Sequence, residues 1–296
     1  MTDCVRRAWL DLNGAIMPLE DEAGGWVCTQ LELGWPEVRD VVSNRPDQHG
    51  TDDLSQYWAS RQVSADITCY GIEVDGLAAQ FAPYMVPSVR PVLHYILDRA
   101  GAPERTLTLR AANYAWPITG KQRRNVQLQW VAPDPVARDV VVKSEGAWSG
   151  STSPPGRAYD LRFNRIYAPG SGAPVNARLE NHGDVAVAPL IRIYGPITGP
   201  QVHVWAMYAD HQDYFTLIFR PTLTIDAGHW VDVDNERHTC WLDGDDTQPV
   251  TDQLDWMASR WVVLAPMPVW HSMALMGSTT SGITQAQAIW RDGFLT

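Results

Sequence analysis

The segment of residues 44–53 (NRPDQHGTDD) gathers side chains that could bind a metal ion or transfer protons. Its charged and ionisable residues are Arg45, Asp47, His49, Asp52 and Asp53. However, Pro46 and Gly50 are typical of a connection between strands, and no helix here would hold two ligands on one face. We therefore expect a loop that is either solvated or part of an interface, and the residues alone do not separate these two alternatives.

A second segment is close to the phosphate-binding P-loop. It reads AWPITGKQ at residues 115–122, but Ala115 stands in place of the first glycine and Gln122 in place of the hydroxyl residue. The residues on both sides have strand character, whereas a P-loop joins a strand to a helix. We do not expect this segment to bind phosphate.

Alternating carboxylates follow the spacing of a calcium loop at Asp232, Asp234, Glu236 and, in the twelfth position, Asp243. Arg237 occupies the sixth position, where such a loop needs glycine for its sharp bend. Val231 and Val233 alternate with the aspartates, as they would along a strand. The pattern therefore predicts solvent-facing carboxylates on a β-strand.

The next residues predict a turn. Asp243-Gly244 lies between apolar alternations and is a strong hairpin signal. A loose metal site formed with Asp245 and Asp246 is the alternative interpretation of this acidic cluster.

No nucleophile stands in a recognisable context. Residues 277–282 (GSTTSG) do not form a G-x-S-x-G elbow. The cysteines are widely spaced, which predicts reduced, buried thiols and no zinc cluster, at Cys4, Cys28, Cys69 and Cys240. We predict no catalytic residues, no metal and no cofactor, and a protein that is not an enzyme. Paired carboxylates that cleave glycosides meet only in the folded chain, so that alternative stays open.

The composition indicates a folded, mainly β protein. The chain has 296 residues, of which 45% are hydrophobic and 19% charged, with 14 Trp, 21 Pro and 22 Gly. The net charge of -11 argues against a protein that grips nucleic acid, because such binding requires cations against phosphates. It does not argue against a protein through which DNA passes without being bound. No run of 18 apolar residues or apolar N-terminal leader is present, so we expect synthesis in the cytoplasm and no membrane insertion.

Short runs of alternating polarity predict the strands that must position these residues. They lie at 7–12, 63–70, 93–98, 105–110, 125–131, 159–163, 175–180, 189–194, 214–219, 230–234 and 238–242. A helix of a turn or two is expected from Leu77, limited by Pro83 and Pro87. The Gly/Ser/Pro-rich segment 144–157 (SEGAWSGSTSPPGR) predicts a linker between domains at 1–143 and 158–296.

The first half resembles the N-terminal ring domain of siphophage distal tail proteins. The segments that resemble it are GWPEVRDVVSNRPDQHGTDD at 34–53, SRQVSADI at 60–67, the short helix, RPVLHY at 90–95 and QLQWVAPDP at 127–135. The second half resembles the galectin-like C-terminal domain at ARLENHGD (177–184), PLIRIYGP (189–196), LTIDAGHWVDVD (223–234) and IWRD (289–292). The similarity is to minor tail proteins of actinobacterial phages and covers nearly the whole chain. A departure is APMPVWH at 265–271, where related chains carry a Pro-Gly-Asn-type turn before the last strands.

The resemblance implies a mainly β fold, with a split-barrel-like ring domain followed by a galectin-like β-sandwich. It also implies a structural role in the virion, as a hexameric ring at the tail tip whose bore lets DNA pass without specific binding. The expected partners are other copies of the chain, the tail tube protein, the tail tip or baseplate hub, and the tape measure protein. The expected subunit interface includes Arg45, Asp47, His49, Asp52, Asp53, Tyr57 and Trp58.

The alternative function is carbohydrate binding by the galectin-like domain. In this interpretation a host saccharide stacks on exposed aromatic rings at Trp205, Tyr208 or Trp230. Aromatic residues in strands are more often part of a core.

Overall fold

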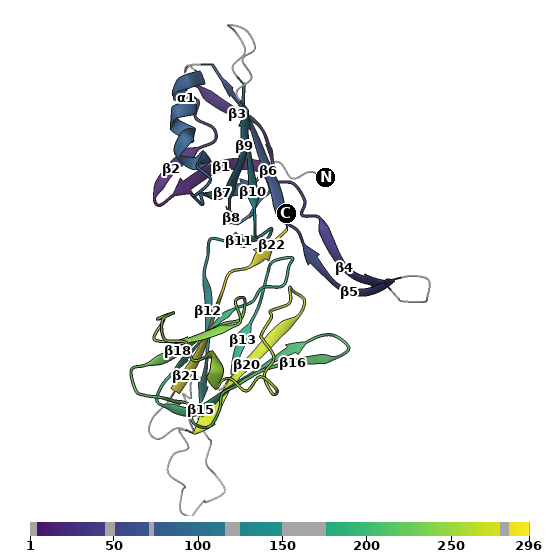
Figure 1. Cartoon of the computed structure of the whole chain (residues 1–296), viewed down its shortest axis with the longest axis vertical. Helices are drawn as coiled ribbons and strands as arrows, with labels where there is room; N and C mark the ends of the chain where they lie inside the picture. The colour runs from purple at the N-terminus through teal and green to yellow at the C-terminus, as the bar shows by residue number, and fades with distance from the viewer. Residues whose placement is uncertain are drawn as a thin grey trace, which may run out of the picture. The chain divides into compact units, whose positions relative to one another are not determined.

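A computed structural model describes residues 5–44, 51–70, 74–115, 125–149, 176–278 and 284–295, and the chain divides into two compact units (Figure 1). Unit 1 consists of Met1–Val140 with Phe294–Thr296, and unit 2 of Val141–Gly293. Strands predominate, and α1 (Val74–Phe81) is the single α-helix among the described residues. The predicted mainly β fold with a short helix in the first half is therefore confirmed.

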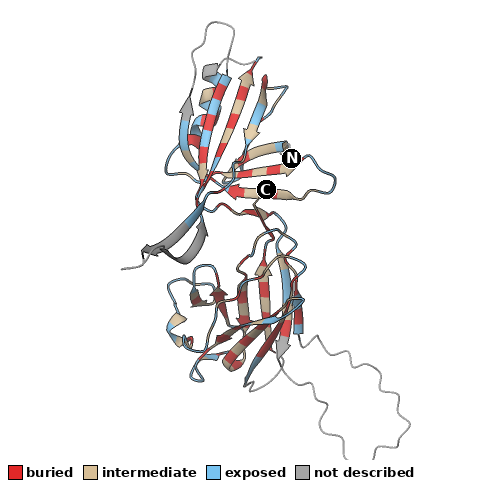
Figure 2. Cartoon of the chain, turned by 90° about the vertical axis from the view of Figure 1, so that its right-hand side faces the viewer, coloured by how far each residue is buried: buried red, intermediate tan, exposed pale blue. Residues whose placement is uncertain are grey.

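Unit 1 contains two larger antiparallel sheets. The first has the order β2-β1-β7-β8-β11-β22, with β1 Val5–Leu12, β2 Ala15–Pro18, β7 Val92–Leu97, β8 Glu104–Thr108, β11 Ala137–Asp139 and β22 Gly293–Phe294. The second has the order β3-β6-β10-β9, with β3 Trp26–Glu32, β6 Arg61–Cys69, β9 Arg110–Ala115 and β10 Asn125–Ala132. The strands alternate between buried and more exposed residues, as Figure 2 shows, so one face of each sheet contributes to a common core.

The helix closes this core at one side. Leu77 and Phe81 of α1 are fully buried, and the following 3-10 turn η1 (Ala82–Met85) buries Tyr84 and Met85. Pro83 stands at the start of η1, where a missing backbone N–H is tolerated, and the chain becomes extended at Val86. The helix is therefore short, as the two prolines predict.

A β-hairpin extends from the body of unit 1. Strands β4 (Val38–Asn44) and β5 (Thr51–Trp58) form a two-stranded sheet, and in the described part of the chain they pair only with each other. Figure 1 shows this arm pointing away from the two larger sheets. Its register shifts between Val41 and Val42, which is a bulge that twists the ribbon.

Unit 2 is a sandwich of two five-stranded antiparallel sheets. The third sheet of the chain has the order β12-β21-β14-β18-β19, with β12 Lys143–Ser149, β14 Leu190–Tyr194, β18 Trp230–Asp234, β19 Thr239–Leu242 and β21 Thr284–Trp290. The fourth has the order β13-β20-β15-β16, with β13 Asn176–Leu179, β15 Ile197–Met207, β16 Gln212–Ile218 and β20 Trp270–Ser278, while β17 (Thr224–Ile225) also pairs with β15. Ile191 and Ile193 from one sheet and Val202 and Val204 from the other are fully buried in one core. A 3-10 turn, η2, covers Thr251–Gln253.

The predicted linker needs correction at its beginning. Residues 144–149 belong to β12, which pairs along its whole length with β21 from Lys143↔Trp290 to Ser149↔Thr284. A Cβ on Gly146 would lie 2.3 Å from Nε2 of Gln285, so a larger residue here would require that side chain to move. Residues 150–157 and the strand expected at 159–163 lie outside the described residues.

The strand predicted at 105–110 is two strands. β8 ends at Thr108 in the first sheet, and β9 starts at Arg110 in the second. Leu109 between them is fully buried and its N–H bonds to the carbonyl of Pro91. The alternating pattern continues across this corner, so the sequence does not show that the chain changes sheets.

Candidate interaction surfaces

The hairpin contains the residues predicted to form a subunit interface. Arg45, Asp47 and His49 lie outside the described residues. The backbone positions of Asp52, Asp53 and Tyr57 are on β5, where Asp53 pairs with Val42 at the bulge. Their role at an interface stays a prediction.

Large apolar side chains are exposed at the base of the hairpin. Trp35 is 67% exposed, Val38 49% and Trp58 45%, and Val38 and Trp58 are cross-strand partners. The first N–H after β5, that of Ala59, bonds to the carbonyl of Glu37, which closes the base of the arm. Clustered apolar exposure of this kind indicates a surface that another molecule covers.

A groove of about 620 Å³ lies beside this base in unit 1. One wall is the start of β1 (Val5–Ala8) and the other is β3, and Trp35 and Leu295 complete the lining. In the described chain β3 pairs with β6 and, at Trp26, forms a single bridge with Asp21; the edge of β1 is covered by β2 from Trp9 to Leu12 and by Leu19, whose N–H bonds to the carbonyl of Ala8. Each wall therefore presents an unpaired strand edge, which can accept an added β-strand.

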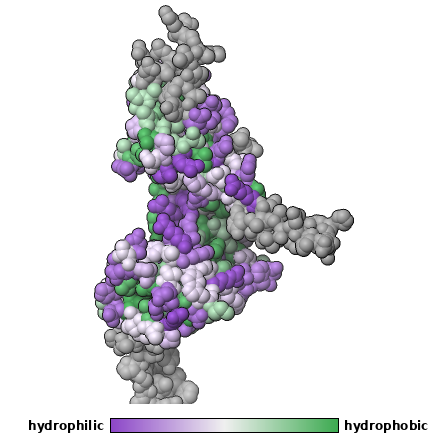
Figure 3. All heavy atoms as spheres, in the orientation of Figure 1, coloured by the Kyte–Doolittle hydropathy of each residue, from purple (hydrophilic) through white to green (hydrophobic). Residues whose placement is uncertain are grey.

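A second groove, of about 650 Å³, runs between the helical turns and β9. Its lining is mostly apolar, with five alanines, Met85, Val86 and Pro87, and Asn113 as the polar residue. The surface over α1 is correspondingly hydrophobic in Figure 3. Nothing in the lining offers a charged or catalytic group.

Neither Cys28 nor Cys240 provides a nucleophile, and Cys4 lies outside the described residues. Burial raises the pKa of Cys28, in the first groove, to about 11, and that of Cys240 to about 12. Both thiols are protonated at neutral pH, and it is the thiolate that reacts. Among the described residues, no group of three or more His, Cys, Asp and Glu side chains could hold a metal ion.

The carboxylates with calcium-loop spacing have structural contacts. Asp232 is 2% exposed, not solvent-facing as predicted, because Arg192 binds both its oxygens (Nε–Oδ1 2.7 Å, Nη2–Oδ2 3.0 Å) and Trp230 Nε1 donates to Oδ2 at 3.1 Å. Hydrogen bonding to Asp232 raises the pKa of Arg192. Asp234 Oδ1 accepts the N–H groups of the turn residues Glu236 and Arg237.

The acidic turn is also structural. Asp243 and Gly244 both have positive φ (53° and 72°), as the hairpin signal predicts, and the chain returns to β19 at Trp241↔Pro249. Asp243 Oδ2 lies 2.6 Å from His229 Nδ1. This hydrogen bond raises the pKa of His229 and lowers that of Asp243.

The aromatic residues proposed to bind saccharide do not form one site. Trp205 and Tyr208 belong to β15 and its end, and the Trp205 ring stacks on His203 at 6.1 Å. Trp230 is on β18 in the opposite sheet, where its ring stacks against Arg192. All three are partly buried; Trp205 and Trp230 are on opposite outer faces of the sandwich, whereas Tyr208 packs against its core. Stacking of a sugar on one of these rings alone stays a prediction.

Sequence reasoning missed the most exposed apolar residue in the described part of unit 2, Met257, and its neighbour Trp256. Met257 is 98% exposed and Trp256 52%, at the tip of a turn held by Asp255, whose Oδ1 accepts the Met257 N–H at 3.1 Å. The Asp two residues before Met257 is the signal that could have identified this turn. Trp256 packs edge-on against Trp261, 5.8 Å between centroids.

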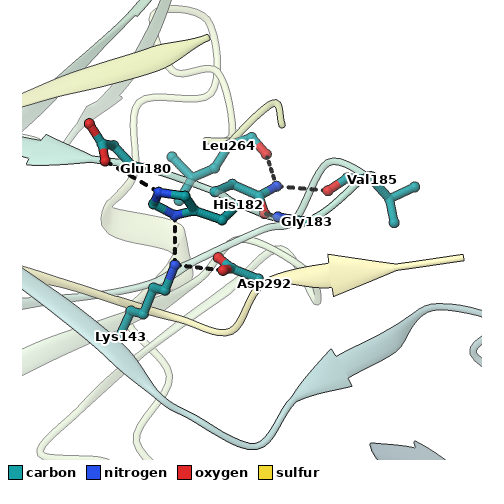
Figure 4. Close-up of polar contacts among 8 residues, drawn as sticks. Lys143, Glu180, His182, Gly183, Val185, Leu264 and Asp292 are labelled. Carbon is teal, nitrogen blue, oxygen red and sulfur yellow. Dashed lines mark hydrogen bonds and ion pairs between the residues drawn. The ribbon is translucent and has the colours of Figure 1, made fainter. Parts of the chain in front are cut away.

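A buried ion pair ties together the two ends of unit 2. Lys143, at the start of β12, lies with Nζ 2.5 Å from Oδ2 of Asp292, which follows β21 (Figure 4). The Asp292 side chain is 3% exposed and that of Lys143 27%. Lys143 Nζ is also 2.9 Å from His182 Nδ1, and His182 Nε2 is 3.6 Å from Glu180. The network therefore fixes the positions where the chain enters and leaves the unit.

The turn that contains His182 also contacts Gly293, where the chain leaves unit 2. Asn181 is fully buried and donates to the carbonyls of Val185 (2.7 Å) and Leu264 (3.0 Å). The N–H of Asp184 bonds to the carbonyl of Gly293. A Cβ on Gly183 would lie 2.0 Å from that same carbonyl oxygen, so glycine is required for the close approach. These contacts position backbone and provide no reactive group.

Comparisons with known proteins identify a shared fold. No protein-family model and no curated protein sequence matches the chain. A solved structure, that of Dit (gp 19.1) of phage SPP1, is similar with a TM-score of 0.57 and 12% identity, over 97% of this chain and 99% of that one. It is described as a paradigm of the hub adsorption apparatus in phages that infect Gram-positive bacteria. The phage P2 baseplate, in its activated conformation with Ca, contains a chain with a TM-score of 0.45 and 12% identity, over 96% and 98% of the two chains.

Proposed function

We propose that the chain is a structural hub subunit of a bacteriophage tail tip and that it assembles through unit 1 into a closed hexameric ring. The observation that supports this most is the shared fold with the hub protein Dit over 97% of the chain. In this account it is a non-enzymatic distal tail protein of a siphovirus, and unit 2 is the galectin-like domain. Other copies, the tail tube protein, the tip or baseplate hub and the tape measure protein are its partners in the virion.

The hairpin and the first groove are the surfaces that join neighbouring subunits. A two-stranded hairpin alone is at best marginally stable in water, so β4 and β5 need a surface to pack on. The groove offers unpaired strand edges and exposed Trp35. A contact between two different patches repeats around an axis and closes into a ring, and each contact should bury at least about 1,000 Å².

The charge of the chain suits passage of DNA. The net charge of -11, from 34 acidic against 23 basic residues, opposes binding of phosphates to the wall of a bore. In the described residues no helix is long and apolar enough to cross a membrane. A role as a passive conduit in the virion is consistent with both observations.

Replacing Arg45 and Asp53 together with alanine is expected to weaken self-association about tenfold, or about 1.4 kcal/mol per contact, because Asp53 is on β5 and Arg45 follows β4 directly in the sequence. Analytical ultracentrifugation over a concentration series gives the change. The control removes one arginine and one aspartate from unit 2, Arg237→Ala with Asp252→Ala, and should leave association unchanged. Unchanged association in the first variant would assign the loop to solvated surface.

A further inference from the structure

Unit 1 is completed by residues that follow the whole of unit 2 in the sequence. Strand β22 lies beside β11 at the end of the first sheet (Figure 1). Phe294 is 7% exposed and belongs to the hydrophobic core of unit 1. β11 is only three residues long and is paired with β8 through Arg138↔Thr106 and Asp139↔Arg105. Without β22, this short strand would form the end of the sheet.

Two buried arginines contact the same segment from different sheets. The Arg105 guanidinium carbon of β8 lies 3.9 Å from the centroid of the Phe294 ring. Arg61 of β6 donates a hydrogen bond from Nη2 to the carbonyl oxygen of Leu295. Both arginines are fully buried. Because a buried guanidinium group needs partners in place of the water it has lost, the contacts with Phe294 and Leu295 help to stabilise both arginines.

The segment also helps to form the first groove. Leu295 lines it together with Leu97, Trp35 and the edge of β3. Loss of the segment would remove part of the wall of the surface proposed above to receive a neighbouring subunit. Leu295 thus links the contacts of β22 to the first groove.

We propose that unit 1 contains a strand-binding site whose ligand is the extended peptide Gly293-Phe294-Leu295, and that its occupation is required before the groove can accept another copy of the chain. Because the ligand is made after unit 2, a chain joins the ring only once unit 2 has been synthesised. The requirement of the occupied site for assembly rests on the proposed function, whereas the strand-binding site itself does not.

Hydrogen exchange on the full chain tests the site. Phe294→Ala is expected to speed amide exchange in β8 and β11 at least about tenfold and to leave β14 and β18 of unit 2 unchanged. Adding an excess of the synthetic peptide Trp-Arg-Asp-Gly-Phe-Leu should restore protection, and the same peptide with alanine in place of phenylalanine should not. If Phe294→Ala fails to fold, Phe294→Leu is measured in the same way, since it removes the ring that Arg105 contacts and keeps an apolar side chain in the core.

The outcomes separate the two claims. Unchanged exchange in β8 and β11, or equal rescue by both peptides, overturns the strand-binding site. Faster exchange with selective rescue supports the site, and ultracentrifugation of the same samples then tests its link to assembly. Self-association that is lost in the variant and restored by the peptide supports the link, whereas self-association equal to that of the unsubstituted chain overturns it. Failure of the unsubstituted chain to associate at all would contradict the proposed ring and leave the exchange result standing.

Discussion

Replacing Lys143 with methionine is expected to lower the free energy of unfolding of unit 2 by about 3 kcal/mol. The substitution leaves the carboxylate of Asp292, 3% exposed, without its cation, and removal of one partner of a buried pair costs about 3–5 kcal/mol. The lower end applies because the Lys143 side chain is itself 27% exposed. Hydrogen exchange in β14 and β18 under increasing urea measures this unit separately from unit 1.

Two matched variants identify the cause of that loss. Adding Asp292→Asn to Lys143→Met removes the unpaired charge and should recover part of the stability. Arg178→Met breaks a comparable pair with Glu180, but the Arg178 side chain is 64% exposed, so the loss should stay below about 1 kcal/mol. Equal losses in Lys143→Met and Arg178→Met would show that burial of Asp292 contributes nothing.

Acidification is expected to destabilise unit 2 through His271. This residue of β20 is fully buried, its Nε2 accepts the N–H of Ala265 at 3.3 Å, and burial lowers its pKa to about 4. An unfolded histidine has a pKa near 6.5, so between these values the unfolded chain binds a proton that the native chain does not. The contribution is complete above about pH 6.5 and is lost as the pH falls toward 4, by about 3 kcal/mol at roughly 1.4 kcal/mol per pKa unit.

The comparison that isolates His271 is between the unsubstituted chain and His271→Gln. The difference in their free energies of unfolding should change by that amount between pH 7 and pH 4, since the other titrating groups are common to both. NMR titration of the His271 ring protons gives the pKa directly. A native-state value near 6.5, or a difference independent of pH, would contradict the account.

Some strands with regular alternation were predicted from the sequence, whereas β21, which alternates from Thr284 to Trp290, was not. β6 and β10 alternate without interruption and were predicted almost to their ends. β15 is the longest strand, yet Gly199 and Pro200 lie within it and indicate a turn. The structure accommodates them at an irregularity between Thr198 and Gln201, with Gly199 at φ 55°, so the strand continues past a turn signal.

The buried ion pair and the arginine contacts described above join parts of the chain that are far apart in the sequence. Lys143 and Asp292 meet because β12 and β21 pair, and neither residue stands in a motif. The contacts of Arg61 and Arg105 with residues 294 and 295 likewise follow from the return of the chain to unit 1. The mainly β fold that the resemblance to distal tail proteins implied is confirmed, and Dit of phage SPP1 shares the fold of the chain; the resemblance used the order of many short segments rather than any single motif. The ring, its bore and its partners stay predictions.

Electron microscopy of the purified full chain, viewed along the symmetry axis of any assembly, tests the central claim most directly. The account predicts closed rings of sixfold symmetry with a central opening, formed by unit 1. A particle that stays monomeric at the highest attainable concentration, or a ring of a different order, would contradict it.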